Sequence, residues 1–199
     1  MKRILKAASG ANRRKRHWMK TTLPRFWRCE IFHALSLLLV SVLGNRDSGK
    51  THTWNTLFNS TVRTGKTERR LYFNNCEYVN VFLVSGSPEE RKTYVGDLIT
   101  VEKPMIVLCS TQYRESVKDT FSYFFENEYF LFVHWLNPGY SDLDTPYFDN
   151  LGLVNWLLFQ KSLIGIRSGK SAATSRVEEI RDYIHSWAKA RNLVLNECD

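Results

Sequence analysis

Residues 44–51 combine glycines, a lysine and a threonine at spacings that suit the binding of phosphate. Gly44, Gly49, Lys50 and Thr51 occupy every fixed position of the pattern G-x-x-x-x-G-K-S/T. Glycines let backbone N–H groups close around an anion, and a helix that begins at the loop points its N-terminus at the same anion. The lysine ammonium then reaches the terminal phosphates, and the threonine hydroxyl holds Mg²⁺. The pattern therefore predicts a nucleoside triphosphate site that uses Mg²⁺ as its cofactor.

The residues on both sides of this motif are typical of a strand and a helix. An apolar run rich in leucine and valine, residues 37–43, comes directly before it, as expected of a buried parallel strand. Trp54, Leu57 and Phe58 follow it at helical spacing. A chance match inside a Gly/Ser turn is the competing explanation, but strand, loop and helix agree. The predicted nucleotide-binding residues are Gly44, Asn45, Arg46, Asp47, Ser48, Gly49, Lys50, Thr51 and His52, with Thr51 also the metal ligand.

The net charge of +8 belongs to the N-terminal segment. Residues 1–30 hold ten Lys or Arg against one acid, whereas the remaining 169 residues hold 18 basic and 19 acidic side chains. The sequence thus predicts a flexible basic arm, residues 1–30, and a nearly neutral nucleotide-binding domain, residues 31–199. The arm is either a solvated tail, with Met19 as an alternative start, or a segment that contacts nucleic acid or an anionic membrane.

The basic arm and the apolar residues 31–43 together superficially resemble a secretory signal peptide. No small-residue cleavage site follows the run, which is too short to span a bilayer, and its residues are needed as the strand before the phosphate loop. The four cysteines lie far apart without a zinc-binding spacing: Cys29, Cys76, Cys109 and Cys198. We therefore expect reduced thiols and a cytoplasmic location.

The rest of the chain alternates predicted strands and helices. Residues 69–73 and 78–84 predict an antiparallel hairpin with an Asn-Asn turn, and residues 85–91 predict a turn that opens a helix at Pro88. Further strands are predicted at 105–109, 129–135 and 163–166, and further helices at 116–127, at 147–161 and after a capping box at 175–178. This order predicts an α/β fold with a mostly parallel sheet, helices on both faces and one antiparallel hairpin strand.

With its flanking strand and helix, the phosphate loop resembles that of the P-loop NTPase superfamily. The order of the predicted elements over residues 35–190 is similar to that of small-GTPase-like domains. The resemblance implies a P-loop NTPase fold in which one of Thr61, Thr64 or Thr67 meets Mg²⁺ and the γ-phosphate. It also implies that the turn at residues 85–88 senses the same phosphate.

The sequence departs from the small-GTPase pattern in its second switch and its base-recognition motif. Residues 85–88 read Ser-Gly-Ser-Pro, without the acid and glycine of D-x-x-G. Residues 137–140 read Asn-Pro-Gly-Tyr where the family carries N-K-x-D to recognise guanine, although Asp142 and Asp144 follow. Residues 168–170 are a weak counterpart of the S-A-K loop. Acids that could replace the missing one near the metal are Glu68, Glu89 and Asp97.

Three functions fit these observations. The first is an ATP- or GTP-binding protein that acts as a slow or partner-stimulated NTPase or switch, in which the triphosphate orders residues 59–68 and 85–92. The second is a P-loop kinase with a small acceptor, for which Arg63, Arg69 and Arg70 are clustered but lie near a predicted hairpin rather than in a lid. The third is a non-hydrolysing scaffold that uses the basic arm. A protein partner is also expected, and the predicted helix at 147–161 offers a surface for one.

Overall fold

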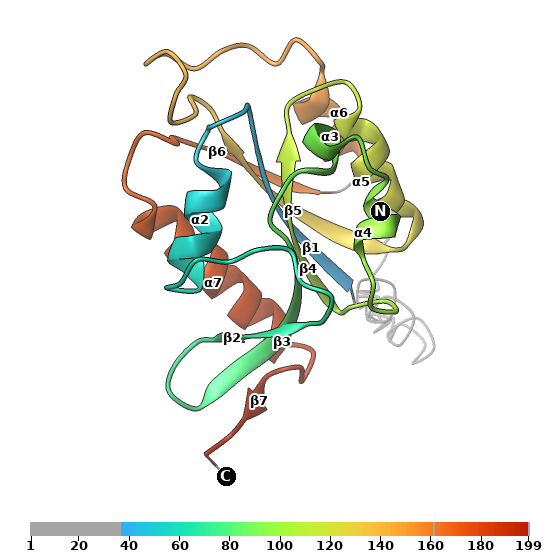
Figure 1. Cartoon of the computed structure of the whole chain (residues 1–199), viewed down its shortest axis with the longest axis vertical. Helices are drawn as coiled ribbons and strands as arrows, with labels where there is room; N and C mark the ends of the chain where they lie inside the picture. Colours follow the sequence, from blue (N-terminus) through green and yellow to red (C-terminus); the bar gives the residue numbers. More distant parts are fainter. Residues whose placement is uncertain (1–36, 161, 199) are drawn as a thin grey trace, which may run out of the picture.

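A mixed, mostly parallel sheet runs through the protein, with helices packed against it (Figure 1). The computed structural model describes residues 37–160 and 162–198. Within these residues the strands are β1 (Leu37–Gly44), β2 (Arg69–Tyr72), β3 (Glu77–Val84), β4 (Ile106–Gln112), β5 (Tyr129–Leu136), β6 (Leu163–Arg167) and β7 (Leu195–Asn196). The helices are α2 (Lys50–Leu57), α3 (Pro88–Arg91), α4 (Val95–Leu98), α5 (Val117–Glu126), α6 (Leu153–Phe159) and α7 (Thr174–Lys189).

Strand β1 lies inside the sheet and is buried along its whole length. The strand order is β2-β3-β4-β1-β5-β6, with β7 paired to β3, and all eight residues of β1 are buried. Strands β3, β4, β1, β5 and β6 run parallel, whereas β2 and β7 are antiparallel to β3. A strand covered on both faces needs apolar side chains at successive positions, which explains the continuous apolar run in the sequence.

Helices cover both faces of the sheet, as the sequence predicts. Leu38, Val40 and Val42 of β1 belong to the core formed with α2 and α7. Leu39 and Leu43 belong to the core formed with α4, α5 and α6 (Figure 1). The α/β class, the mostly parallel sheet and the antiparallel hairpin are therefore confirmed, whereas the assignment to the P-loop NTPase fold stays a prediction.

Several predicted boundaries are wrong, most clearly in the segment before β6. The helix expected at 147–161 is reduced to α6, which follows Gly152 in the left-handed conformation with φ of 60°. Asn137 holds the preceding segment in an irregular path, because its amide oxygen accepts from the Tyr147 N–H at 2.9 Å. Helix α7 begins at Thr174 without a side-chain cap, so the expected capping box does not form. Strand β4 continues to Gln112, beyond its predicted end.

Strand β4 separates β1 from β3, so the turn after β3 starts two strands away from the phosphate loop, a lateral distance of about 10 Å. Helix α3 follows this turn and packs against β4. Its Glu89 carboxylate accepts a hydrogen bond from the backbone N–H of Gln112 at 2.8 Å, at the end of β4. This hydrogen bond anchors the turn at residues 85–88 to the end of β4. The turn and the loop after β1 line the same cleft.

The basic arm, residues 1–30, lies outside the described residues, and so do residues 31–36 of the apolar run. Within the described ranges, no helix has both the length and the hydropathy to cross a bilayer. The roles predicted for the arm, and the cytoplasmic location, therefore stay predictions.

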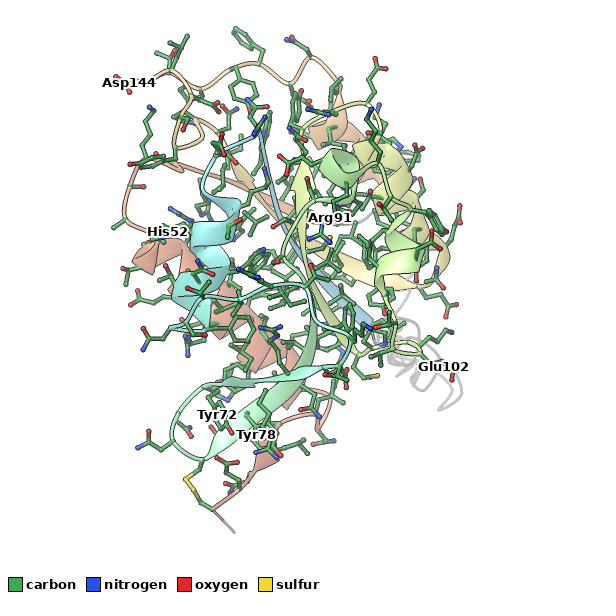
Figure 2. The ribbon with its side chains drawn as sticks, viewed as in Figure 1. His52, Tyr72, Tyr78, Arg91, Glu102 and Asp144 are labelled. Atoms are coloured by element: carbon green, nitrogen blue, oxygen red, sulfur yellow. A yellow bond between two sulfur atoms is a disulfide. The ribbon has the colours of Figure 1, made fainter. Side chains whose placement is uncertain are left out.

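A disulfide joins Cys76 and Cys198, so the expectation of reduced thiols is wrong for this pair (Figure 2). Cys76 lies in the turn between β2 and β3, and Cys198 follows β7. The pairing of β7 with the start of β3 brings the two Cα atoms to 5.3 Å from positions 122 residues apart. Cys109 is a buried free thiol, and Cys29 lies outside the described residues.

We expect reduction of this disulfide to lower the free energy of unfolding. In the chain-entropy account, a cross-link that closes a loop of about 100 residues restricts the unfolded chain by about 5 kcal/mol. Guanidinium unfolding of the wild type should therefore shift to lower denaturant concentration when dithiothreitol is added. The Cys76→Ser/Cys198→Ser double variant is the control, because its stability should match the reduced protein and not respond to dithiothreitol. Equal stability of the oxidised and reduced wild type would contradict the expectation.

His134 is a buried titratable group of β5, packed against α7. Its side chain is fully buried, and neither ring nitrogen has a hydrogen-bond partner among the described residues. Its Nε2 lies 3.6 Å from the Glu179 carboxylate, which Arg167 already binds through two hydrogen bonds. Burial lowers the pKa of His134 to about 4, and the nearby Glu179 only partly opposes this. The imidazole is therefore neutral at pH 7, and its contact with Glu179 is not an ion pair.

Stability should accordingly fall in mildly acidic solution. An unfolded chain protonates His134 near pH 6.5, whereas the folded chain does so near pH 4, so the unfolded state binds more protons between these values. The free energy of unfolding is expected to drop by at most about 3 kcal/mol as pH falls through this window. Urea unfolding of His134→Phe should show a shallower dependence on pH than the wild type. The partly exposed His185, changed to Gln, is the control. Parallel curves for wild type and His134→Phe would refute the assignment.

Candidate nucleotide-binding site

The loop between β1 and α2 turns through two residues in the left-handed conformation. Asp47 has φ of 57° and Gly49 has φ of 99°. Aspartate is one of the few residues with a side chain that tolerate this region, and glycine adopts it without steric cost. Helix α2 begins at Lys50, directly after Gly49. The predicted order of strand, loop and helix is therefore present.

A cleft of 560 Å³ lies over this loop. Its walls come from the loop and the start of α2, the turn after β3 and the loop after β5. They are Arg46, Asp47, Ser48, Gly49, Lys50, Thr51, His52, Ser85, Gly86, Ser87, Glu90, Tyr140 and Ser141. Seven of the nine predicted residues thus line one cleft. Gly44 lies at the end of β1, and Asn45 lines a neighbouring pocket of 440 Å³.

Lys50 is buried and bonded to neutral groups. Its ammonium donates to the carbonyl oxygen of Gly44 at 3.2 Å and to that of Asn45 at 2.5 Å. Burial lowers its pKa, while the charges of Glu90, Glu89 and more distant acids raise it. Hydrogen bonds from an ammonium to anionic oxygens are stronger than those to neutral carbonyls. A phosphate in the cleft would therefore give this ammonium better acceptors than it has.

Three glycines let neighbouring loops approach Ser48 closely. A Cβ on Gly44 would lie 2.3 Å from the Ser48 hydroxyl, one on Gly139 would lie 2.5 Å from its Cβ, and one on Gly169 would lie 2.4 Å from its carbonyl oxygen. That oxygen also accepts a hydrogen bond from the Tyr140 N–H at 3.1 Å. The loops after β5 and β6 therefore fix the position of the phosphate loop.

Arg176 of α7 adds a second connection beneath the cleft. Its buried guanidinium donates through Nε to the Thr53 hydroxyl of α2 at 3.0 Å. Through Nη1 it donates to the carbonyl oxygens of Ser168 and Ser171, at 3.2 and 3.0 Å. The loop that contains Gly169 is thereby tied to the helix that follows the phosphate loop.

Two polar residues of the cleft, Thr51 and Glu90, could serve as ligands of Mg²⁺. The Thr51 side chain is exposed at the start of α2, and Glu90 is exposed on the facing wall of the same cleft. The described residues contain no group of three or more His, Cys, Asp or Glu side chains that could hold a metal ion. Mg²⁺ in nucleotide sites takes only one or two protein ligands and otherwise uses phosphate oxygens and water. One hydroxyl and one carboxylate therefore fit Mg²⁺ bound together with a triphosphate.

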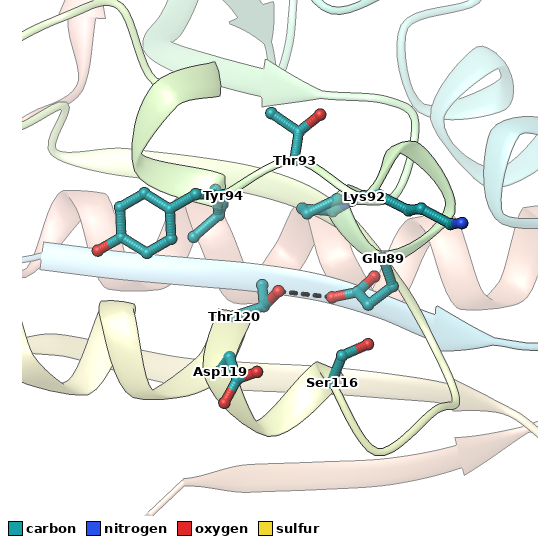
Figure 3. A pocket seen from close by; sticks show the side chains of 9 residues that line it. Glu89, Lys92, Thr93, Tyr94, Ser116, Asp119 and Thr120 are labelled. Atoms are coloured by element: carbon teal, nitrogen blue, oxygen red, sulfur yellow. Dashed lines mark hydrogen bonds between the residues drawn. The ribbon is translucent and has the colours of Figure 1, made fainter.

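None of the three acids proposed from the sequence as metal-site residues lines the cleft, whereas Glu90 does. One Glu89 carboxylate oxygen accepts from the Gln112 N–H, and the other accepts from the Thr120 hydroxyl at 2.5 Å. Its side chain lines a separate pocket of 320 Å³ between α3 and α5 (Figure 3). Glu68 and Asp97 do not line the cleft. The sequence could not distinguish the two neighbouring glutamates, because only the direction of the short helix α3 decides which one faces the loop.

The two segments predicted to sense the γ-phosphate contact each other. Among the three candidate threonines, Thr64 accepts a hydrogen bond from the Ser85 N–H at 3.0 Å and one from Arg91 Nη2 at 3.3 Å. The Arg91 guanidinium lies over Gly86, where a Cβ would come within 2.4 Å of Nη2 (Figure 2). The connection at 59–68 and the turn at 85–88 are therefore mechanically linked at the edge of the cleft.

The polar residues at and just after the place where N-K-x-D is missing have partners outside the cleft. Both amide atoms of Asn137 bond to the backbone of Tyr147, at 2.8 and 2.9 Å. The Asp142 carboxylate accepts from the Gly139 N–H at 2.8 Å and from the Asn45 amide at 3.3 Å. Asp144 extends into solvent and pairs with Lys170 at 3.2 Å. None of these three side chains lines the phosphate cleft.

No family model, curated protein or solved structure matches this chain. The sequence pattern found the loop residues, because they are contiguous and share a known spacing. It missed Glu90, Tyr140 and Arg176, which approach the loop only through the tertiary fold.

The close approach of Gly169 to Ser48 predicts a specific sensitivity to substitution. A Cβ at Gly169 would meet only backbone atoms, which cannot move as a flexible side chain can, so Gly169→Ala should destabilise the protein by about 1–3 kcal/mol in urea unfolding. Gly65→Ala is the matched control, because its Cβ would lie 3.3 Å or more from any neighbour, and its effect should stay within about 0.5 kcal/mol. Similar stability of the two variants would show that the loops do not pack as described.

Proposed function

We propose that this chain binds ATP or GTP together with Mg²⁺ in the cleft lined by residues 46–52. The observation that carries the proposal is Lys50, a buried ammonium with only neutral carbonyl acceptors, at the N-terminus of an eight-residue helix that opens onto the cleft. A buried ammonium whose hydrogen bonds go only to neutral groups is costly, and a helix N-terminus favours an anion at the same place. A triphosphate would give the Lys50 ammonium anionic acceptors and would place negative charge at the N-terminus of α2.

Two hydroxyl groups support a phosphate as the ligand. Ser48 and Ser87 line the cleft from opposite walls, and their hydroxyls are buried without a hydrogen-bond partner among the described residues. Buried hydroxyls are normally paired, and each can donate to a phosphate oxygen. In the proposed complex Lys50 binds the terminal phosphates, while Thr51 and Glu90 hold Mg²⁺. The metal would neutralise charge on the phosphates.

Slow or partner-stimulated hydrolysis, as in a switch, agrees with this arrangement. Water activation in phosphoryl transfer relies on a positioned polar residue and often on an arginine. Glu89 is bonded through both oxygens, and Arg91 lies against Gly86 and Thr64. Arg46 pairs with Asp47 at 3.7 Å and is largely exposed. A partner that supplies or repositions one of these groups would accelerate the reaction.

The two alternative functions receive less support. Arg69 and Arg70 belong to β2 rather than to a lid, and Arg70 pairs with Glu197 at 2.7 Å, so phosphoryl transfer to a small acceptor is not favoured by them. A scaffold role for the basic arm depends on residues outside the described ranges. Its contacts with nucleic acid or membrane stay predictions.

We expect Lys50→Ala to weaken nucleotide binding by at least about 100-fold, because charge-assisted hydrogen bonds to the phosphates are lost. The measurement is a titration of wild type and variant with fluorescent ATP and GTP analogues in the presence of Mg²⁺. Lys66→Ala is the matched control, because Gly65, Lys66 and Thr67 repeat the end of the motif outside the cleft. Chelation of Mg²⁺ should also lower wild-type affinity. Unchanged binding by Lys50→Ala would refute the proposal.

A further inference from the structure

A slot of 250 Å³ opens beside the phosphate cleft, lined by Gly49, His52, Tyr140 and Gly169. The first three of these residues also line the cleft, so the two spaces adjoin each other. One end of the slot is the loop where the phosphates are proposed to lie. The slot is therefore where the remainder of a bound nucleotide, its base, would extend.

Tyr140 lines this slot, and hydrogen bonds fix its backbone. Its N–H donates to the Ser48 carbonyl oxygen at 3.1 Å, and its own carbonyl oxygen accepts from Lys170 Nζ at 3.4 Å. The side chain is 66% exposed and makes no ring contact with another described residue. An exposed aromatic side chain whose backbone is bonded to the loop after β1 is suited to stacking on a planar base.

The slot has few side-chain groups to read the edge of a base. Two of its four lining residues are glycines, and the other two contribute rings. Asn137 and Asp142 lie where a guanine-recognition motif would stand, but their side chains have other partners. Asn137 bonds to Tyr147, and Asp142 bonds to Gly139 and Asn45. Strong discrimination between ligands that differ in hydrogen-bonding groups requires a site built to pair with those groups.

We infer that this slot holds a purine base by stacking on Tyr140 and does not select between adenine and guanine. This inference rests on the proposed binding of the triphosphate in the adjoining cleft. Stacking depends on the face of the base, which adenine and guanine share, and is tolerant of base identity. Within the proposed binding of ATP or GTP, recognition is therefore concentrated in the phosphates, and the base contributes by stacking.

The test is a set of titrations of the full chain with ATP, GTP and inorganic tripolyphosphate, each with Mg²⁺. We expect the affinities for ATP and GTP to agree within about 5-fold, and tripolyphosphate to bind about 5- to 100-fold more weakly, because it lacks the stacked base. Tyr140→Ala should weaken ATP and GTP binding by a similar factor and leave tripolyphosphate unaffected. Tyr140→Phe should bind like the wild type, and Tyr94→Ala, an exposed tyrosine outside the slot, is the control.

The outcomes separate this inference from the proposed function. A preference of more than about 20-fold for one purine, or full nucleotide affinity in Tyr140→Ala, would overturn the inference while tripolyphosphate binding upheld the phosphate site. Failure of all three ligands to bind would overturn both. Equal losses for ATP, GTP and tripolyphosphate in Tyr140→Ala would also overturn the inference, because the residue would then act by supporting the Ser48 loop.

Discussion

The complete burial of β1 determines where the candidate site can be. All eight residues of this strand are buried between β4, β5 and the helices on the two faces of the sheet. The chain emerges from the interior only at Gly44, at the carboxyl end of parallel strands, where α/β proteins gather their ligand-binding loops. The loop after β1 therefore meets the loops after β5 and β6 at one edge of the sheet, and the cleft lies above them.

Backbone approach, rather than side-chain packing, holds these loops together. The contacts of Ser48 with Gly139 and Gly169 leave no space for a Cβ, and Arg176 ties the loop at 168–171 to α2 from below. A loop fixed in this way loses little conformational freedom when an anion enters. Pre-organisation of this kind leaves more of the interaction energy available for binding. Directly after the same loop, Lys50 is buried beside the neutral carbonyls of Gly44 and Asn45.

Local patterns predicted the parts of the fold that depend on local physics. The apolar run of β1, the glycines of the loop and the Asn-Asn turn each act within a few residues. The first part of the helix expected at 147–161 does not form, because Asn137, ten residues earlier, binds the backbone of Tyr147. The Cys76–Cys198 disulfide depends on the pairing of β7 with β3, and no spacing rule contains that pairing. The sequence also could not predict that β4 lies between β1 and β3 in the sheet, because buried parallel strands have similar compositions.

The segment at residues 137–142 uses its polar side chains to stabilise its own path, which limits what the proposed nucleotide complex can distinguish. Asn137 and Asp142 stabilise their own loop, so the identity of the base has little influence on the proposed complex. What can differ between two bound states is then the number of phosphates. Ser87 and Ser85 line the cleft, and Ser85 is bonded through its N–H to Thr64. A terminal phosphate that moves the turn at 85–88 would therefore also move the connection at 59–68, whereas a diphosphate that does not reach the turn would leave both in place. In the proposed switch, the linked segments 85–88 and 59–68 would therefore differ in position between the triphosphate and diphosphate complexes.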